Sequence, residues 1–228
     1  MAEDIELGPG KGNLTGSMPL LRELQHAFYE IARQAELGGG DSLSKVQLRA
    51  EQALRLVDSC IISTQVEVGQ MQLNLSPYGV GSIMHEAAHE LRQEVGYSVG
   101  VYTGVNQPVV TNAELLKNML YSAGNFMYDS VKTPIILRSF ATKTGGVGVG
   151  VFAKDFAITP RDLRKALTMS EATYMPMAQH SQRSGVLLVL ADAIAQALGS
   201  ELRVKRLGNH KGFAAILPKS QQLSLVAG

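Results

Sequence analysis

The chain has 228 residues, enough for one large domain or two small ones. Hydrophobic residues make up 45% of it and charged residues 18%, which excludes a disordered, collagen-like or disulfide-rich protein. The formal net charge of +1 gives no field that would steer the chain to nucleic acid or to an anionic membrane, so we expect neither partner. Because Cys60 is the one cysteine and the first residues are acidic, we expect a reducing, cytoplasmic location.

The N-terminal part predicts a tail followed by a helical hairpin. Residues 1–17 are rich in glycine and lack an apolar period, so we expect a flexible tail. Within residues 18–75, apolar side chains recur every three or four positions in two runs separated by Gly38–Gly40. These are Leu21, Leu24, Phe28, Ile31 and Ala35, then Val46, Ala50, Ala53, Val57, Cys60 and Thr64. Two helices with one apolar stripe each bury little, so we expect a homodimer with a four-helix bundle.

A turn-rich segment, Asn74–Gly79, suggests a boundary before a second domain over residues 76–228. Its pattern predicts helices over 80–95 and 112–128, a short helix from Pro160, and a helix over 185–198. Strands are expected at 98–102, 134–140, 147–151, 201–205 and 212–217, with a loop over 169–182. This order favours an α+β sandwich, with helices on one face of a mixed sheet.

Four strings resemble the transmitter module of bacterial sensor histidine kinases. They are Ala53-Leu-Arg-Leu-Val-Asp-Ser, Val66-Glu-Val-Gly-Gln, Ile158-Thr-Pro-Arg-Asp-Leu and the glycine-bounded run Gly185–Gly199. The resemblance covers residues 18–218 and implies a dimerising hairpin followed by the ATP-binding fold shared with DNA gyrase. It also implies a place in two-component signalling, with a receiver domain or another kinase as partner.

The family's phosphoacceptor histidine has no direct counterpart here. The matching string, Arg22-Glu-Leu-Gln-His-Ala-Phe28, places Arg22 where the histidine would stand. A guanidinium does not lose its proton near neutral pH and cannot accept a phosphoryl group. His26 lies one helical turn later, so a displaced phosphoacceptor remains an alternative.

The resemblance also implies a magnesium-binding asparagine pair on the helix over 112–128. One register replaces the pair by Ser122 and Phe126, and the other replaces it by Asn118 and Ser122. Both registers lose the second asparagine. A serine hydroxyl could still hold a water on the metal, whereas a phenylalanine offers no oxygen.

The family's adenine-binding and phosphate-binding glycine motifs are changed as well. Ala153 stands where an aspartate would bind adenine, and Asp155 and Ala157 stand where glycines would be. Asp155 itself is the alternative, shifted adenine-binding carboxylate. Gly185 is kept, but Leu187 replaces the second glycine where the phosphates would meet a helix N-terminus.

These changes predict a protein that keeps the scaffold and loses the kinase chemistry. We expect it to act by binding a receiver domain or a kinase through Arg22, Gln25 and His26, with Mg-ATP binding lost and no other cofactor or metal. Two alternatives remain open. One is an ATP-independent phosphotransferase that uses His26, and the other is a divergent, active histidine kinase.

A second motif, His85-Glu-Ala-Ala-His89, matches the string of zinc proteases, whose two histidines share one helical face. The charged Glu90 directly after it and the lack of a third ligand downstream favour a solvated helix face instead.

Overall fold

The computed structural model describes residues 73–95, 98–105, 107–154, 156–168 and 186–219, together with single helical residues between positions 25 and 65. The elements are β1 (Ser76–Gly79), α3 (Val80–Val95), β2 (Val99–Thr103), β3 (Pro108–Thr111), α4 (Ala113–Val131), β4 (Ile135–Ala141), β5 (Val147–Ala153), α5 (Pro160–Thr168), α6 (Val186–Ala197), β6 (Arg203–Leu207) and β7 (His210–Leu217). Among these elements, no helix is long and apolar enough to cross a bilayer.

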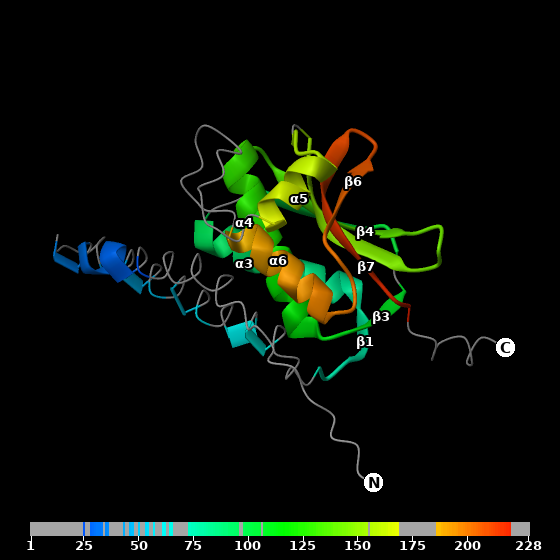
Figure 1. The fold of residues 1–228 in the computed structure, drawn as a ribbon, viewed down its shortest axis with the longest axis horizontal. Coiled ribbons are helices and arrows are strands. Elements are labelled where there is room, and N and C mark those ends of the chain that lie inside the picture. The colour runs from blue at the N-terminus through cyan, green and yellow to red at the C-terminus, as the bar shows by residue number, and fades with distance from the viewer. Residues whose placement is uncertain are drawn as a thin grey trace, which may run out of the picture.

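The main sheet has five strands in the order β2-β4-β5-β7-β6. Strands β2 and β4 run parallel, and the other neighbours run antiparallel. Helices α3, α4 and α6 pack together beside this sheet, and α5 lies next to α6 (Figure 1). The expected α+β architecture, with helices on one face of a mixed sheet, is confirmed.

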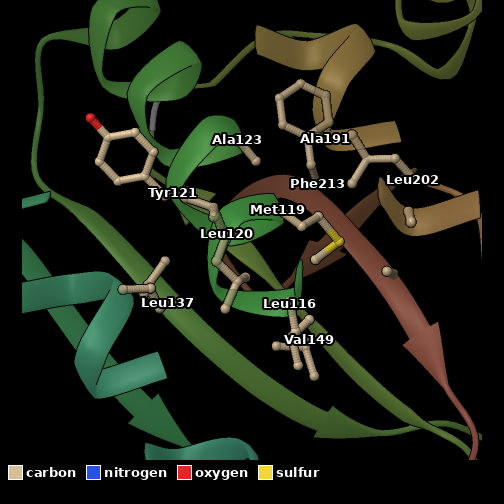
Figure 2. Packing of buried hydrophobic residues seen from close by; sticks show 14 of the residues in the cluster. Leu116, Met119, Leu120, Tyr121, Ala123, Leu137, Val149, Ala191, Leu202 and Phe213 are labelled. Atoms are coloured by element: carbon tan, nitrogen blue, oxygen red, sulfur yellow. The ribbon is translucent and has the colours of Figure 1, made fainter. Parts of the chain in front are cut away.

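The core lies between the helices and the sheet. Figure 2 shows Leu116, Met119 and Leu120 of α4 beside Val149 of β5 and Phe213 of β7. Each of these five side chains is at most 1% exposed. Burial of such side chains is the main stabilising contribution, about 1.5 to 3 kcal/mol for each one.

Helix α4 begins and ends at identifiable capping residues. The side chain of Asn112 accepts a hydrogen bond from the backbone N–H of Leu115 at 3.0 Å. At the other end, Lys132 adopts a left-handed conformation with φ 53°, and its N–H donates to the carbonyl of Tyr128 at 2.7 Å. The helix therefore continues three residues beyond the predicted end at 128, because the terminating conformation falls at Lys132.

Two four-residue strands are absent from the prediction. The sequence predicts turns over 74–79, which is wrong for Ser76–Gly79, since these residues form β1 and pair antiparallel with Pro108–Thr111 of β3. Strand propensity is low here, because Pro77 and Gly79 weaken the pattern. The backbone N–H of Val110 also donates to the carbonyl of Pro218 at 3.2 Å, so the chain after β7 lies beside β3.

The last hairpin also differs from its predicted bounds. The sequence predicts strands over 201–205 and 212–217, whereas β6 covers Arg203–Leu207 and β7 covers His210–Leu217. The turn between them contains Gly208 with φ 65°, a conformation that glycine adopts without strain. Each strand therefore extends two residues closer to the tight turn than the sequence predicts.

Within the predicted hairpin, the described residues between Gln25 and Glu36 and between Leu43 and Gln65 are helical. Ala53 is 2% exposed, and Ile62 and Leu73 pack against the core of the second part of the chain. The end of this helical region therefore contacts the α+β fold directly. How the two helices pair, and whether a second copy joins them, lies outside the described residues.

Candidate nucleotide site

The predicted site residues of α4 and β5 lie in the interior. Ser122 and Phe126 are one turn apart on α4 and are 3% and 4% exposed. Ala153 is the last residue of β5 and is fully buried. Helix α4 packs against β5, so the two parts of the predicted pocket come from neighbouring elements.

An aromatic cluster joins α4 to the end of the sheet. The rings of Phe126 and Phe213 have centroids 5.9 Å apart, and the ring of Phe156 stands edge-on to Phe213 at 5.1 Å. Phe156 is 6% exposed and follows β5 by three residues. Edge-to-face and tilted pairs of this kind are favourable arrangements of buried aromatic rings.

Sequence reasoning missed Phe156 and Phe213 as site residues. Phe156 lies inside the altered adenine motif, between the two positions where glycines would be, and a large apolar side chain there was the available signal. Phe213 belongs to a strand pattern near the end of the chain, and nothing local links it to α4.

The segment after β5 leads into a well-capped helix. The side chain of Asp162 accepts hydrogen bonds from the backbone N–H of Thr159 at 2.9 Å and from its hydroxyl at 2.6 Å. The Thr159 hydroxyl in turn accepts from the N–H of Asp162 at 3.2 Å, which completes a reciprocal cap. The predicted start of a short helix at Pro160 is confirmed.

The other predicted glycine-motif residues have different positions. Ala157 is exposed between β5 and α5. Leu187 lies in the first turn of α6 and packs partly buried against the core. Asp155 and Gly185 lie outside the described residues.

Asp192 on α6 is a buried carboxylate with structural partners. One oxygen accepts from the backbone N–H of Leu202 at 2.9 Å, and the other accepts from the side-chain amide of Gln196 at 2.7 Å. Both oxygens are therefore engaged, one in linking α6 to the residue before β6 and the other in a bond within α6.

The His85–His89 segment, which matches the zinc-protease motif, lies on α3. His85, Glu86 and His89 are all exposed. Glu90 forms an ion pair with Lys117 of α4 at 3.2 Å. In the described part of the chain, no three histidine, cysteine or acidic side chains group closely enough to hold a metal ion.

Lys117 is shared by two carboxylates, Glu90 at 3.2 Å and Glu114 at 2.8 Å. Partial burial lowers the pKa of Lys117, but the hydrogen bonds and negative charges of Glu114 and Glu90 raise it further, so the net pKa lies above its ordinary value. The ion pair between Lys117 and Glu90 links α4 to α3.

Of the predicted partner-binding residues, the structure describes Gln25, which is helical and exposed. Arg22 and His26 lie outside the described residues.

Comparison with known proteins gives a fold relationship. No protein-family model matches the chain, and no curated protein matches it by sequence. Among solved structures, the histidine kinase AdeS of Acinetobacter baumannii superposes with a TM-score of 0.59 at 12% identity, over 89% of this chain and 96% of that one. Full-length ShkA, solved in complex with AMPPNP, superposes with a TM-score of 0.55 at 16% identity, over 88% of this chain and 45% of ShkA.

The chain therefore has a histidine-kinase-like fold, as the sequence resemblance implies. At these identities the likeness concerns the fold and does not extend to the chemistry, because one fold supports proteins with different activities.

Proposed function

We propose that this chain is a dimeric, histidine-kinase-like signalling protein that acts by binding and does not use ATP. In this proposal residues 18–75 form the dimerisation hairpin and residues 76–228 form a domain of the histidine-kinase ATPase type. Residues 1–17 are a tail with no assigned role.

The observation that carries the proposal is the aromatic cluster of Phe126, Phe156 and Phe213. Its rings join α4 to the end of the sheet, the region where the resemblance would place adenine and magnesium. Mg-ATP needs a hydrogen-bond acceptor for the adenine amine and oxygen ligands for the metal. Ala153 supplies no acceptor. On α4, one register offers Phe126, which has no oxygen, and the other offers Asn118 with Ser122 in place of the second asparagine, so both registers lose a magnesium ligand.

The size of the expected loss is large. Removing a charged hydrogen-bond partner costs about 1.5 to 3 kcal/mol, and each 1.4 kcal/mol is about tenfold in affinity. Loss of the adenine carboxylate and of a metal ligand together would weaken a micromolar site by on the order of a thousandfold.

The proposed dimer is supported by apolar side chains that the single chain leaves uncovered. Among the described helical residues of the hairpin, Phe28 is 55%, Leu54 64% and Ile61 49% exposed. Large apolar side chains repeated along a helical surface are commonly covered by another helix. A second copy of the hairpin, forming a four-helix bundle, would cover them.

The proposed partner surface is the exposed first helix around Arg22, Gln25 and His26. A receiver domain, or the hairpin of an intact histidine kinase, is the class of partner that this scaffold would bind. This assignment is an extension of the resemblance, supported by the exposure of Gln25.

Two measurements test the proposal. Titration of the purified protein with millimolar Mg-ATP should give no calorimetric heat and no thermal shift. Incubation with a phosphorylated receiver domain should give a complex without acid-labile phosphate on this chain.

The contrary outcomes identify the two alternatives. Phosphate transferred to His26 without ATP would establish a phosphotransferase. Saturable micromolar ATP binding would show that the register through Ala153 or Ser122 is shifted and would favour a divergent, active kinase.

A further inference from the structure

The five-stranded sheet has a second face that is not part of the main core. The helix-facing side chains of β4, β5 and β7, such as Leu137, Val151 and Phe213, belong to the core cluster. Phe152 and Ala214 are also fully buried, but they lie outside that cluster. Since successive strand residues point to opposite faces, these two residues mark a separate apolar layer on the open face.

The strand register places one row of residues across this open face. In order from β2 to β6, the row is Tyr102, Arg138, Gly150, Ala214 and Arg203. The next row along the strands contains Ile136 and Phe152 and ends at Lys205. Side chains directly opposite in neighbouring strands share a face, so the two rows are neighbours on this face of the sheet. Tyr102 and Arg203 are its exposed members, Ile136, Arg138 and Lys205 are half-buried, and the residues in the middle of the rows are buried.

All the charged side chains of the five strands are basic. The five strands contain no aspartate or glutamate. Their charged residues are Arg138, Arg203, Lys205, Arg206 and Lys211. The register assigns Arg138, Arg203 and Lys205 to the open face, so this face is basic although the whole chain is close to neutral.

Arg138 is held in place without an anionic partner. Its guanidinium carbon lies 4.8 Å from the centre of the Tyr102 ring, which is a favourable cation–π arrangement. Its Nε is buried and has no hydrogen-bond acceptor. In the described structure the guanidinium pairs with no carboxylate, unlike Arg203, which pairs with Glu201. The buried Nε is out of reach of a partner, but the half-buried side chain still brings a positive charge to this face of the sheet, and a guanidinium pairs favourably with a carboxylate.

Apolar side chains lie directly beside this arginine. Ile136 and Phe140 precede and follow it on the same face of β4, and both are half-buried. The Phe140 ring covers Gly148 so closely that a Cβ there would lie 2.2 Å from the ring, and it stands edge-on to Phe152 at 6.2 Å. The surface beside Arg138 is therefore apolar and firmly packed.

We propose that this open face is a docking surface for an acidic protein segment that also carries apolar side chains. A carboxylate of the segment pairs with Arg138, a second one approaches Lys205, and its apolar side chains lie on Ile136 and Phe140. A protein segment fits better than single-stranded nucleic acid, because bases need free aromatic faces. Here the Tyr102 ring stacks on Arg138 and Phe152 is fully buried.

The test uses a fluorescein-labelled peptide of three alternating glutamate–leucine repeats as the probe, with fluorescence anisotropy on the full chain. We expect saturable binding that weakens as salt is added. A matched glutamine–leucine peptide should bind about tenfold more weakly, because it lacks the charge-assisted contacts.

Two substitutions test whether the peptide binds on the open face. Arg138→Gln should weaken the acidic peptide about tenfold, and Lys205→Gln should weaken it severalfold. The matched control is Arg161→Gln on α5, where an exposed arginine outside the five strands and their two rows loses the same charge, and it should bind as the wild type does. Thermal melts confirm folding, and Lys205→Gln decides the result if Arg138→Gln does not fold.

Four outcomes overturn the proposal. They are no saturation by the acidic peptide, equal binding of the glutamine peptide, equal weakening by Arg138→Gln and Arg161→Gln, and tighter binding of a labelled oligothymidine than of the acidic peptide. The last outcome would assign the face to single-stranded nucleic acid.

Discussion

Phe156, just after β5, stands edge-on to Phe213 of β7 with ring centroids 5.1 Å apart. This contact joins the segment after β5 to the last strand of the chain. It also makes the region part of the hydrophobic core, because both rings belong to the main cluster of buried side chains.

Removal of the Phe156 ring should therefore destabilise the protein. We expect Phe156→Ala to lower the free energy of unfolding by about 3 kcal/mol, through lost burial and the cavity that remains. The control is Tyr78→Ala, because the Tyr78 side chain is 41% exposed and should cost much less. Urea denaturation measures both. Equal losses would mean that the aromatic cluster contributes nothing special to stability.

A charge in the hairpin should dissociate the proposed dimer. Phe28→Glu and Val57→Glu each place a carboxylate where the bundle would bury an apolar side chain, and burial of an unpaired charge is unfavourable. Light scattering at tens of micromolar protein should show a wild-type dimer and monomeric variants.

The matched control for the dimer is Gln93→Glu on α3, which adds the same charge at an exposed helical position outside the hairpin and should remain dimeric. A monomeric wild type at that concentration would contradict the proposed architecture.

We expect Asp192 to stabilise the fold as a hydrogen-bond acceptor. Asp192→Ala leaves the backbone N–H of Leu202 buried without its partner, which should cost about 2 kcal/mol in the free energy of unfolding. Asp192→Asn keeps one acceptor oxygen and should cost less. Chemical denaturation of the three proteins is the measurement. If Asn costs as much as Ala, the hydrogen bond to Leu202 is not the main contribution.

The ion pairs of Lys117 predict a pH dependence of stability. Since the folded-state pKa of Lys117 is raised, its charge stabilises the fold fully below the ordinary lysine pKa of about 10.4. That stabilisation is lost as the pH rises through the higher folded-state pKa. Lys117→Met should therefore lower stability by about 0.5 to 1 kcal/mol at neutral pH, and the difference from the wild type should shrink in strong alkali.

Thermal unfolding between pH 7 and about pH 11 measures this difference. A difference that stays constant over the whole range would show that Lys117 acts through the packing of its aliphatic chain, not through its charge.

The elements with strong local signals follow from the sequence. The sequence predicts a helix over 112–128, and α4 is that helix, with residues 119–127 all buried. Thr159-Pro160 predicts the start of α5 because a hydroxyl cap and a proline in the first turn act locally. The order of these elements was enough to predict the α+β fold and its likeness to histidine kinases.

The tertiary structure decided the features that join distant residues. β1 and β3 become strands because they pair with each other, although Pro77 and Gly79 disfavour a strand locally. Phe126, Phe156 and Phe213 meet because the sheet register and the packing of α4 bring three separate segments together. The register likewise aligns Tyr102, Arg138 and Lys205 on one open face, and no periodicity within a single strand specifies which strands become neighbours.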